Sequence, residues 1–564
     1  MLGAAFLRRW LPALLLVPML GFALSVGVRT TGDLDWPDTT CCAVGSDMFR
    51  DITFAQSIVD EGFGKDGFYL GESIWYNPLT AFVIVVGSKV TGLPLHVVDV
   101  RIGAYVILLA PLCFFLMTRA LFGSWTAMAA TTAFLFLTAL DLPGFASPTY
   151  SPWLLPVTVT QSLFYLSLWA LRKATASRTN RSIKMMGVGA LLGATFLGHT
   201  APAVILGALL VASTVRTVVI EHIVTRQGQM RQASVLVATL LVAVVTSSPL
   251  LYYIVGRYGL RILNIHPGVG SWAPLTYGLP DLLISHVTVP FAIAIVGLAR
   301  VVRRRERNSE FLVLAWMATC VALILLNYGR IGAGLLFGRS WASTVPTFHF
   351  FFYLKATSAI CFGCGLTTMC QAAARLLARR LSGFSVGGLC RALTVATVLV
   401  LATANLSAFV SRSDFVANRR EALRRNGAFG EFTVGEKIQT PERVDARIAA
   451  YEWIRRNTVR TDVFLSNDQQ SLFVVAPAGA KVVAAGRVFS NPYVSWDQRT
   501  ADRKALFDLL DRDDVEGFLG LAKRYKVTYV ITDWDTSARY AGKLPSVLSL
   551  VFSQADISVF RVVR

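Results

Sequence analysis

The chain has 564 residues, of which 54% are hydrophobic and 16% are charged, and its formal net charge is +20. A soluble protein carries about 25% charged residues, so this composition excludes an ordinary soluble protein and indicates a membrane protein with a polar part. The positive excess lies mostly in short loops between apolar segments, where membrane topology explains it, so nucleic-acid binding is not expected.

About eleven apolar segments are spread between Trp10 and Val410, and we predict that each forms a membrane-crossing helix. The segments cover residues 11–28, 100–118, 125–140, 153–171, 186–197, 202–219, 235–255, 282–298, 311–326, 350–373 and 393–410. The pair 186–197 and 202–219 is broken near His199.

Basic residues set the expected orientation. Arg8 and Arg9 precede the first segment and place the N-terminus in the cytoplasm. A further apolar stretch, 78–90, is short of the ~20 residues that a span needs, so we predict a helix lying on the outer face. With this assignment every basic cluster faces inward, whereas counting 78–90 as a span would put the cluster at 172–184 outside.

The sequence therefore predicts a polytopic α-helical membrane protein with about 11 transmembrane helices and outer-face juxtamembrane helices. Residues 1–410 form the membrane domain, with a first outer loop at 29–98, and residues 411–564 form a soluble extracytoplasmic α/β domain. We expect a multi-pass protein of the cell (inner) membrane with a cytoplasmic N-terminus.

The C-terminal segment alternates helical and strand patterns, which favours a parallel or mixed sheet. Helices are predicted at 443–457 and 507–525, and strands at 462–465, 474–476, 527–532 and 557–563.

An acidic residue marks the start of a helical pattern in the first outer loop. Apolar residues recur at helical spacing from Phe49 to Val59, and Ser46 is suited to cap that helix. Asp47 would then lie in the first turn, where the helix dipole stabilises an anion. Asp47 is either a catalytic carboxylate or a second capping acid.

The order of these features resembles the GT-C superfamily of membrane glycosyltransferases, which take sugars from polyprenyl-phosphate donors. The features are a first span, Asp47 opening an amphipathic helix, the sequence Tyr76-Asn77-Pro78-Leu79 before a second short helix, and Arg101 at the next span. The resemblance covers the layout of the whole chain. It implies that Asp47 is the catalytic base and that Tyr76 and Asn77 lie beside the substrate.

The chain differs from many members of that superfamily at specific positions. Met48 stands where many show a second acid, and Asn77 stands where lipid-A-type sugar transferases often show a lysine that touches phosphate. The second outer loop often carries another catalytic acid, for which Asp141 is the candidate here. Asp141 could equally be an aspartate that ends a helix at the membrane interface.

The chemistry requires a base and cations. An acceptor hydroxyl loses its proton to a positioned carboxylate as it attacks the anomeric carbon, and cations stabilise the departing lipid phosphate. Arg339 is a candidate, as are Arg257, Arg261 and Arg330 in expected outer loops, because Arg suits bidentate phosphate contact. The alternative for each is ordinary contact with lipid headgroups.

Three further polar residues interrupt apolar segments. His349, followed by Phe350 and Tyr353, is similar to an Arg-Phe…Tyr pattern in many GT-C proteins. Lys355 enters an apolar helix, where a charge costs about 2.5–3.5 kcal/mol unless the side chain snorkels to the surface. His199 lies at the outer turn of a broken helix pair, as either a substrate-binding or a structural histidine.

The sequence predicts an inverting glycosyltransferase that moves a sugar from a polyprenyl-phosphate donor to a lipid-linked or cell-envelope glycan. Membrane lipids are expected partners, and nucleic acid is not. No GxxxxGK[ST], GxGxxG, HExxH or WWDYG motif marks a nucleotide, metal or oligosaccharyltransferase site. A divalent metal remains compatible with the chemistry. The alternatives are a secondary transporter or lipid flippase, and a non-catalytic factor in envelope-polysaccharide assembly.

Overall fold

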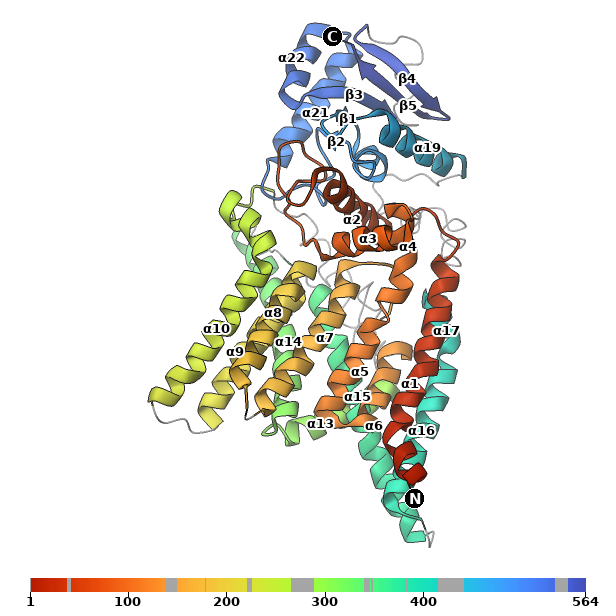
Figure 1. Ribbon diagram of the computed structural model, residues 1–564, viewed down its shortest axis with the longest axis vertical. Coiled ribbons are helices and arrows are strands. Elements are labelled where there is room, and N and C mark those ends of the chain that lie inside the picture. The colour runs from red at the N-terminus through yellow and green to blue at the C-terminus, as the bar shows by residue number, and fades with distance from the viewer. Residues whose placement is uncertain are drawn as a thin grey trace. The chain divides into compact units, whose positions relative to one another are not determined.

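The structure is a computed structural model, shown in Figure 1. It describes residues 2–37, 42–137, 150–177, 179–220, 226–264, 289–338, 345, 348–380, 384–413, 441–532 and 546–563. Internal contacts divide the chain into two compact units. The helical unit comprises Met1–Asp33, Gly103–Ser248 and Gly268–Phe415, and the mixed unit comprises Leu34–Ile102, Pro249–Pro267 and Val416–Arg564. The first loop thus clusters with the C-terminal segment, and the predicted domains 1–410 and 411–564 stay a prediction.

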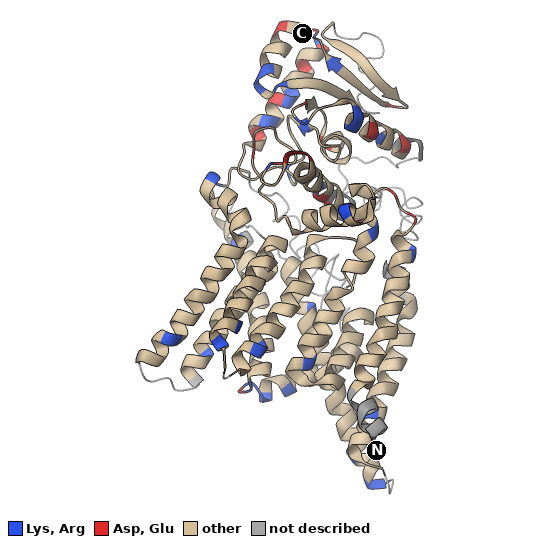
Figure 2. Ribbon diagram, in the orientation of Figure 1, with Lys and Arg blue, Asp and Glu red and all other residues tan. Residues whose placement is uncertain are grey.

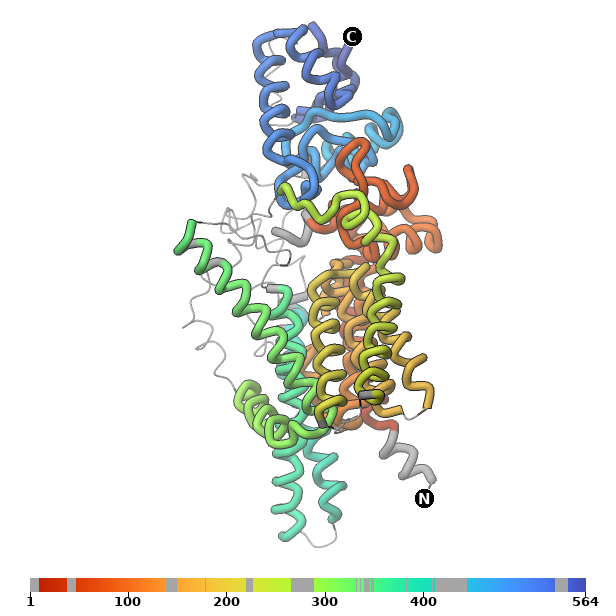
Figure 3. The backbone as a smooth tube through the Cα atoms, turned by 90° about the vertical axis from the view of Figure 1, so that its left-hand side faces the viewer, coloured from red at the N-terminus to blue at the C-terminus, as the bar shows by residue number. Residues whose placement is uncertain are grey.

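The helical unit is a bundle of long apolar helices. They are α1 (Leu2–Thr31), α5 (Leu109–Phe122), α6 (Ser124–Phe136), α7 (Pro156–Ala176), α8 (Arg181–Gly198), α9 (Thr200–Ile220), α10 (Arg226–Leu251), α13 (Val289–Arg303), α14 (Asn308–Phe337), α15 (Phe348–Arg380), α16 (Val386–Ala404) and α17 (Leu406–Ser413). Helix α15 packs against α6, α13, α14 and α16 and is the centre of the bundle. Figure 3 shows α15 and α16 side by side as a long hairpin.

Glycines allow α15 to approach its neighbours closely. A Cβ atom on Gly297 of α13 would lie 1.7 Å from the carbonyl oxygen of Cys361, and one on Gly365 would lie 2.0 Å from that of Ile293. Small residues at such crossings are typical of helix packing in membranes, where close van der Waals contact replaces the hydrophobic effect as the driving force.

Among the described residues, seven helices are long and apolar enough to cross a membrane, by length and composition. They are Trp10–Thr31, Leu95–Phe122, Thr200–Val219, Gln227–Arg257, Asn308–Gly334, His349–Arg380 and Val386–Ala404. The protein is therefore a multi-pass membrane protein, as predicted. The other expected segments lie on α6, α7, α8 and α13, so far as they are described, and the count of eleven spans stays a prediction. His199 is the break between α8 and α9, as expected.

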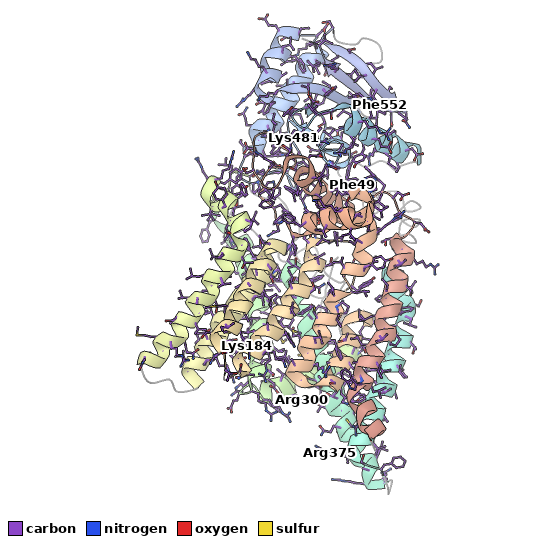
Figure 4. The ribbon with its side chains drawn as sticks, in the orientation of Figure 1. Phe49, Lys184, Arg300, Arg375, Lys481 and Phe552 are labelled. Carbon is purple, nitrogen blue, oxygen red and sulfur yellow. The ribbon has the colours of Figure 1, made fainter. Side chains whose placement is uncertain are left out.

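Basic residues gather at one end of the helical unit (Figure 2). Lys184, Arg300 and Arg375 are labelled near that end in Figure 4. This distribution is the one that the positive-inside bias produces. That this end faces the cytoplasm stays a prediction.

The described residues of the mixed unit form a five-stranded sheet in the order β2-β1-β3-β5-β4. The strands are β1 (Val463–Leu465), β2 (Lys481–Val482), β3 (Val527–Thr532), β4 (Leu548–Gln554) and β5 (Ile557–Val562). Strands β1, β2 and β3 are parallel, and β5 pairs antiparallel with β3 and β4. Apolar residues of these strands pack against α21 (Trp496–Asp511) and α22 (Val515–Tyr525). The sheet, predicted to be parallel or mixed, is mixed.

The C-terminal elements differ from expectation at two places. Residues 474–476 are not a strand, because η4 (Ser471–Val475) is a helical turn that follows α20 (Asp468–Gln470). The predicted helix 507–525 is two helices, α21 and α22, separated by a turn in which Asp513 adopts a positive φ of 56°. The helix predicted at 443–457 is present as α19 (Pro441–Asn457).

The first loop forms three helices. Helix α2 (Cys42–Glu61) precedes α3 (Leu79–Thr91), which is the short helix predicted at 78–90, and α4 (Leu95–Val106) follows. Helix α3 ends at Gly92, whose φ of 72° suits glycine. Between α2 and α3 the backbone oxygen of Phe68 accepts a 2.9 Å hydrogen bond from the Val482 nitrogen. The first loop thereby covers the edge strand β2 within the mixed unit.

Candidate functional site

Helix α2 brings a cluster of charged residues together. Arg50 lies between two carboxylates, since its Nη1 donates to Oδ1 of Asp47 at 2.7 Å and its Nε donates to Oδ1 of Asp51 at 2.9 Å. The spacing explains the contact between Asp47 and Arg50, because residues three apart face the same side of a helix. We call Asp47, Arg50, Asp51, Tyr76 and Asp99 the carboxylate cluster.

Exposure separates the two carboxylates that contact Arg50. The side chain of Asp47 is 37% exposed, whereas those of Arg50 and Asp51 are 7% and 3% exposed. Of these two carboxylates, Asp47 is the one that is accessible from solvent, and the buried Arg50 orients it. This arrangement suits a general base, which needs both reach and a fixed direction.

The start of α2 corrects one expectation. The helix begins at Cys42, so Ser46 lies inside it and is not the N-cap, and Asp47 is beyond the first turn. The helix dipole acts mainly within the first turn, so it is not the main influence on Asp47. The ion pair with Arg50 takes its place.

Tyr76, a predicted site residue, belongs to this cluster. The guanidinium carbon of Arg50 lies 4.0 Å from the centroid of the Tyr76 ring, which is a cation–π contact. Burial raises the pKa of Tyr76 above its ordinary value, although Arg50 opposes the shift. Asn77 follows directly and is half-buried, and Pro78 after it is the N-cap of α3.

Asp51 and Asp99 are buried acids that the sequence reasoning did not single out. Burial raises the pKa of Asp51 to about 6, and the attraction of Arg50 offsets only part of that rise. Asp99 on α4 is fully buried and interacts electrostatically with Asp51 and Arg50. Among the described residues, neither of its oxygens nor Oδ2 of Asp51 has a hydrogen-bond partner.

The charge of Arg50 is secured by the same cluster. Burial alone would lower the pKa of its guanidinium, but Asp47 and Asp51 raise it above the ordinary value. Arg50 is therefore a permanent cation beside Asp47. The signal that could have found it is its position one turn after Asp47, and Asp99 is one residue before a predicted span.

The helical unit brings two other predicted residues together. The rings of His199 and His349 stack with centroids 4.4 Å apart. His199 is fixed at the break between α8 and α9, because its Nδ1 accepts a 3.1 Å hydrogen bond from the backbone nitrogen of Ala201. Lys355, six residues after His349 on α15, is buried, and so is Tyr353. His349 and Lys355 thus lie on α15, and the His199 ring contacts His349 from the break between α8 and α9.

The remaining predicted residues either lie outside the described residues or make contacts away from these two groups. Asp141 and Arg339 lie outside the described residues. Arg257 is exposed, and its Nη2 donates to the backbone oxygen of Gly71 at 3.2 Å. Within the described ranges, no group of three or more His, Cys, Asp or Glu residues is arranged to hold a metal ion.

Comparisons with known proteins show a likeness of structure without a likeness of sequence. No family model matches the chain, and neither does any curated protein sequence. ArnT from Cupriavidus metallidurans in the apo state matches with a TM-score of 0.56 and 14% identity, over 97% of this chain and 97% of that one. The same protein bound to undecaprenyl phosphate matches with a TM-score of 0.52, 14% identity and the same coverage.

A second kind of enzyme matches as well. The archaeal oligosaccharyltransferase AglB from Archaeoglobus fulgidus, in complex with an inhibitory peptide and a dolichol-phosphate, matches with a TM-score of 0.54 and 12% identity, over 95% of this chain and 71% of that one. At such identities the likeness establishes the fold. The chain shares the fold of ArnT and of this oligosaccharyltransferase, and the predicted resemblance is confirmed at the level of the fold.

Proposed function

We propose that the protein is an inverting glycosyltransferase that moves a sugar from a polyprenyl-phosphate donor to a lipid-linked or cell-envelope glycan at the outer face of the membrane. The observation that carries the proposal is the pairing of the half-exposed Asp47 carboxylate with the buried Arg50 guanidinium. The structural neighbours add support, since one is bound to undecaprenyl phosphate and another to a dolichol-phosphate.

Asp47 acts as the general base in this proposal. As the acceptor hydroxyl attacks the anomeric carbon, its proton passes to a carboxylate oxygen of Asp47, and the bond to the donor phosphate breaks on the opposite face of the sugar. Arg50 holds that carboxylate in one direction through Oδ1. A fixed carboxylate lowers the entropic cost of reaching the transition state.

The leaving phosphate requires cations. His349, Lys355 and His199 are the proposed contacts in the helical unit, together with Arg339. A buried ammonium group is costly in an apolar helix, and a cost of that kind is usually retained for function. Tyr76 and Asn77 are proposed substrate contacts because Tyr76 contacts Arg50 directly.

The proposal includes the membrane topology with eleven spans. Eleven spans with the basic ends inside would place the C-terminal segment and the first loop outside the inner membrane. Donor sugars on flipped polyprenyl phosphates would be available there. Asp141 is proposed as a second catalytic acid of the following outer loop, and a divalent metal would be supplied from the medium if the reaction needs one.

The alternative functions make different demands on the chain. A transporter or flippase requires charged residues near the bilayer centre that bind its cargo, and a non-catalytic assembly factor requires no base. Both would tolerate Asp47→Asn, whereas a transferase would not. The oriented carboxylate of Asp47 favours the enzyme.

The direct experiment is transfer by the purified full-length protein from a panel of polyprenyl-phosphate sugars. Asp47→Asn should lower kcat by about 10²–10⁴-fold, because a positioned base contributes that much. Asp35→Asn is the matched control, since Asp35 also lies in the first loop but its side chain is 76% exposed. Absence of transfer from every donor, together with unchanged envelope glycans in a deletion strain, would refute the proposal.

A further inference from the structure

The far end of α2 is held by a second charged cluster, which the reaction itself does not use. Asp60, in the last turn of α2, has one carboxylate oxygen that accepts from three donors: Nη1 of Arg455 at 2.9 Å, Nε of Arg460 at 2.7 Å and Nε2 of Gln56 at 2.7 Å. Arg455 is on α19, and Arg460 follows that helix. The side chain of Asp60 is only 9% exposed, so these contacts are partly shielded from water.

Glu61, the next residue on α2, also forms an ion pair with the C-terminal segment. Glu61 forms an ion pair with Lys481, the first residue of β2, whose side chain is buried. The Nζ atom of Lys481 also donates to the backbone oxygen of Asp66 at 2.8 Å. A buried ammonium group that lost Glu61 would retain its desolvation cost without its charge partner. We call Asp60, Glu61, Arg455, Arg460 and Lys481 the α2 anchor.

The other end of α2 touches the same C-terminal elements through apolar contact. The ring of Phe49 meets that of Phe473 in η4 edge-on, with centroids 5.1 Å apart. Phe49 lies between Asp47 and Arg50 in sequence. The ring contact with Phe473 is therefore made by the same turn of α2 that carries the carboxylate cluster. Helix α2 is thus held at both ends by residues from 441–482.

We propose that Asp60, Arg455 and Arg460 are positioning residues for sugar transfer, although none of them lies near Asp47. Asp60 is thirteen residues after Asp47, about 20 Å along the helix at 1.5 Å per residue. A helix transmits a displacement of one end to the other as a rigid rod, and a misplacement of about 1 Å at a catalytic group can lower a rate about 10²-fold. This inference rests on the proposed function, because it assigns Asp47 the role of base.

The shared contact also predicts how the substitutions of the two arginines compare with that of Asp60. Since both donate to the same oxygen of Asp60, either one retains part of the attraction when the other is lost. Arg455→Ala and Arg460→Ala should each have a smaller effect than Asp60→Ala. The triple variant should resemble Asp60→Ala alone, because all three substitutions remove one interaction.

The experiment compares Asp60→Ala with Arg456→Ala in the full-length protein. Arg456 is next to Arg455 on α19, but its ion pair with Glu452 is exposed, so it is a matched control. Backbone hydrogen exchange is measured over residues 47–55 and over β3, and kcat and the donor KM are measured in the same samples. Asp60→Ala should raise exchange at 47–55 but not in β3, and lower kcat roughly 10- to 100-fold with little change in donor KM. Arg456→Ala should do neither.

Each other outcome has a defined meaning. Unchanged exchange at 47–55, or unchanged kcat, would overturn the proposal. An equal rise in exchange in β3 would show that Asp60 supports the whole unit, which also overturns a positioning role. Asp60→Glu, which retains the charge, should restore part of kcat. If the unmodified protein transfers no sugar from any donor, the proposed function fails, while the exchange measurement still decides whether the anchor holds α2.

Discussion

The Nη1 atom of Arg50 donates a 2.7 Å hydrogen bond to Oδ1 of Asp47, one turn earlier on the same helix. Arg50 is buried and its Nε is bound to Asp51, so the position of the guanidinium is fixed independently of Asp47. The guanidinium therefore holds the Asp47 carboxylate in place. The direction of the exposed carboxylate is thus set by a buried ion pair rather than by the end of the helix. Three consequences can be measured at this cluster and one in the helical unit.

The first prediction concerns the shape of the cation. Arg50→Lys keeps the positive charge, but an ammonium group cannot bond Asp47 and Asp51 in the guanidinium geometry and also stack on Tyr76. We expect a folded protein whose kcat is lower by about tenfold or more. Arg50→Met should instead be destabilised by about 3–5 kcal/mol, because the buried Asp51 carboxylate would lose its partner. Turnover and the thermal unfolding midpoint separate these two effects, and Arg456→Lys, at an exposed side chain of α19, serves as control. Full turnover by Arg50→Lys would contradict the prediction.

The second prediction concerns the ring under Arg50. Tyr76→Phe keeps the aromatic face that lies 4.0 Å from the guanidinium and should remain close to the unmodified protein in stability. Tyr76→Ala removes it and should lower the free energy of unfolding by about 0.5–2 kcal/mol for the cation–π contact, in addition to lost packing against Phe54. Chemical unfolding of both variants measures the difference. A loss of turnover in Tyr76→Phe with unchanged stability would show that the hydroxyl group, rather than the ring, matters.

The elements that could be predicted from sequence are those whose pattern is local. Long apolar runs, the break at His199 and the β-branched run Val527–Thr532 each specify their structure within a few residues. The strand predicted at 474–476 is wrong because this stretch belongs to a short apolar run, Ser471–Val475, that is buried on every side. Such a run has no period that distinguishes helix from strand. Strand β2 has only two residues and shows no alternation at all.

In the candidate site, too, contacts between residues near in sequence could be predicted, and contacts between distant residues could not. The helical pattern makes Asp47 a candidate from sequence alone, and the same argument reaches Arg50 and Asp51, which are three and four residues away. The ion pair between Glu61 and Lys481 joins residues 420 positions apart, so no local pattern contains it. The sequence does not distinguish Asp99, because one acid beside an apolar run looks like an ordinary helix end, and its complete burial is visible only in the structure.

The third prediction follows from the raised pKa of Asp51. Burial raises this pKa to about 6, whereas an aspartate in an unfolded chain titrates near about 3.9. Between these values the folded protein holds a proton that the unfolded chain has lost, so the contribution of Asp51 to stability is complete below about pH 4 and is lost as the pH rises through about 6. A shift of about two units corresponds to roughly 3 kcal/mol.

Asp51→Asn should therefore flatten the decline of stability between pH 4 and pH 7. Part of the decline should remain, because burial also raises the pKa of Asp66 to about 6. The measurement is the thermal unfolding midpoint across this pH range, with Asp35→Asn as the exposed control. An Asp51→Asn protein with the same pH slope as the unmodified one would show that Asp51 is already ionised at pH 4.

The last prediction tests whether Lys355 serves function or structure. Its side chain is 1% exposed on the apolar helix α15, where an ammonium group costs about 2.5–3.5 kcal/mol by insertion scales. If Lys355 is retained for the donor phosphate, Lys355→Met should leave the unfolding midpoint unchanged or higher and raise the donor KM, while Lys355→Arg should keep part of the affinity. If instead it only completes a buried ion pair, Lys355→Met should lose about 3–5 kcal/mol of stability with an unaltered KM. Donor titration of both variants, alongside their unfolding midpoints, distinguishes the two, and the second result would remove Lys355 from the proposed phosphate contacts.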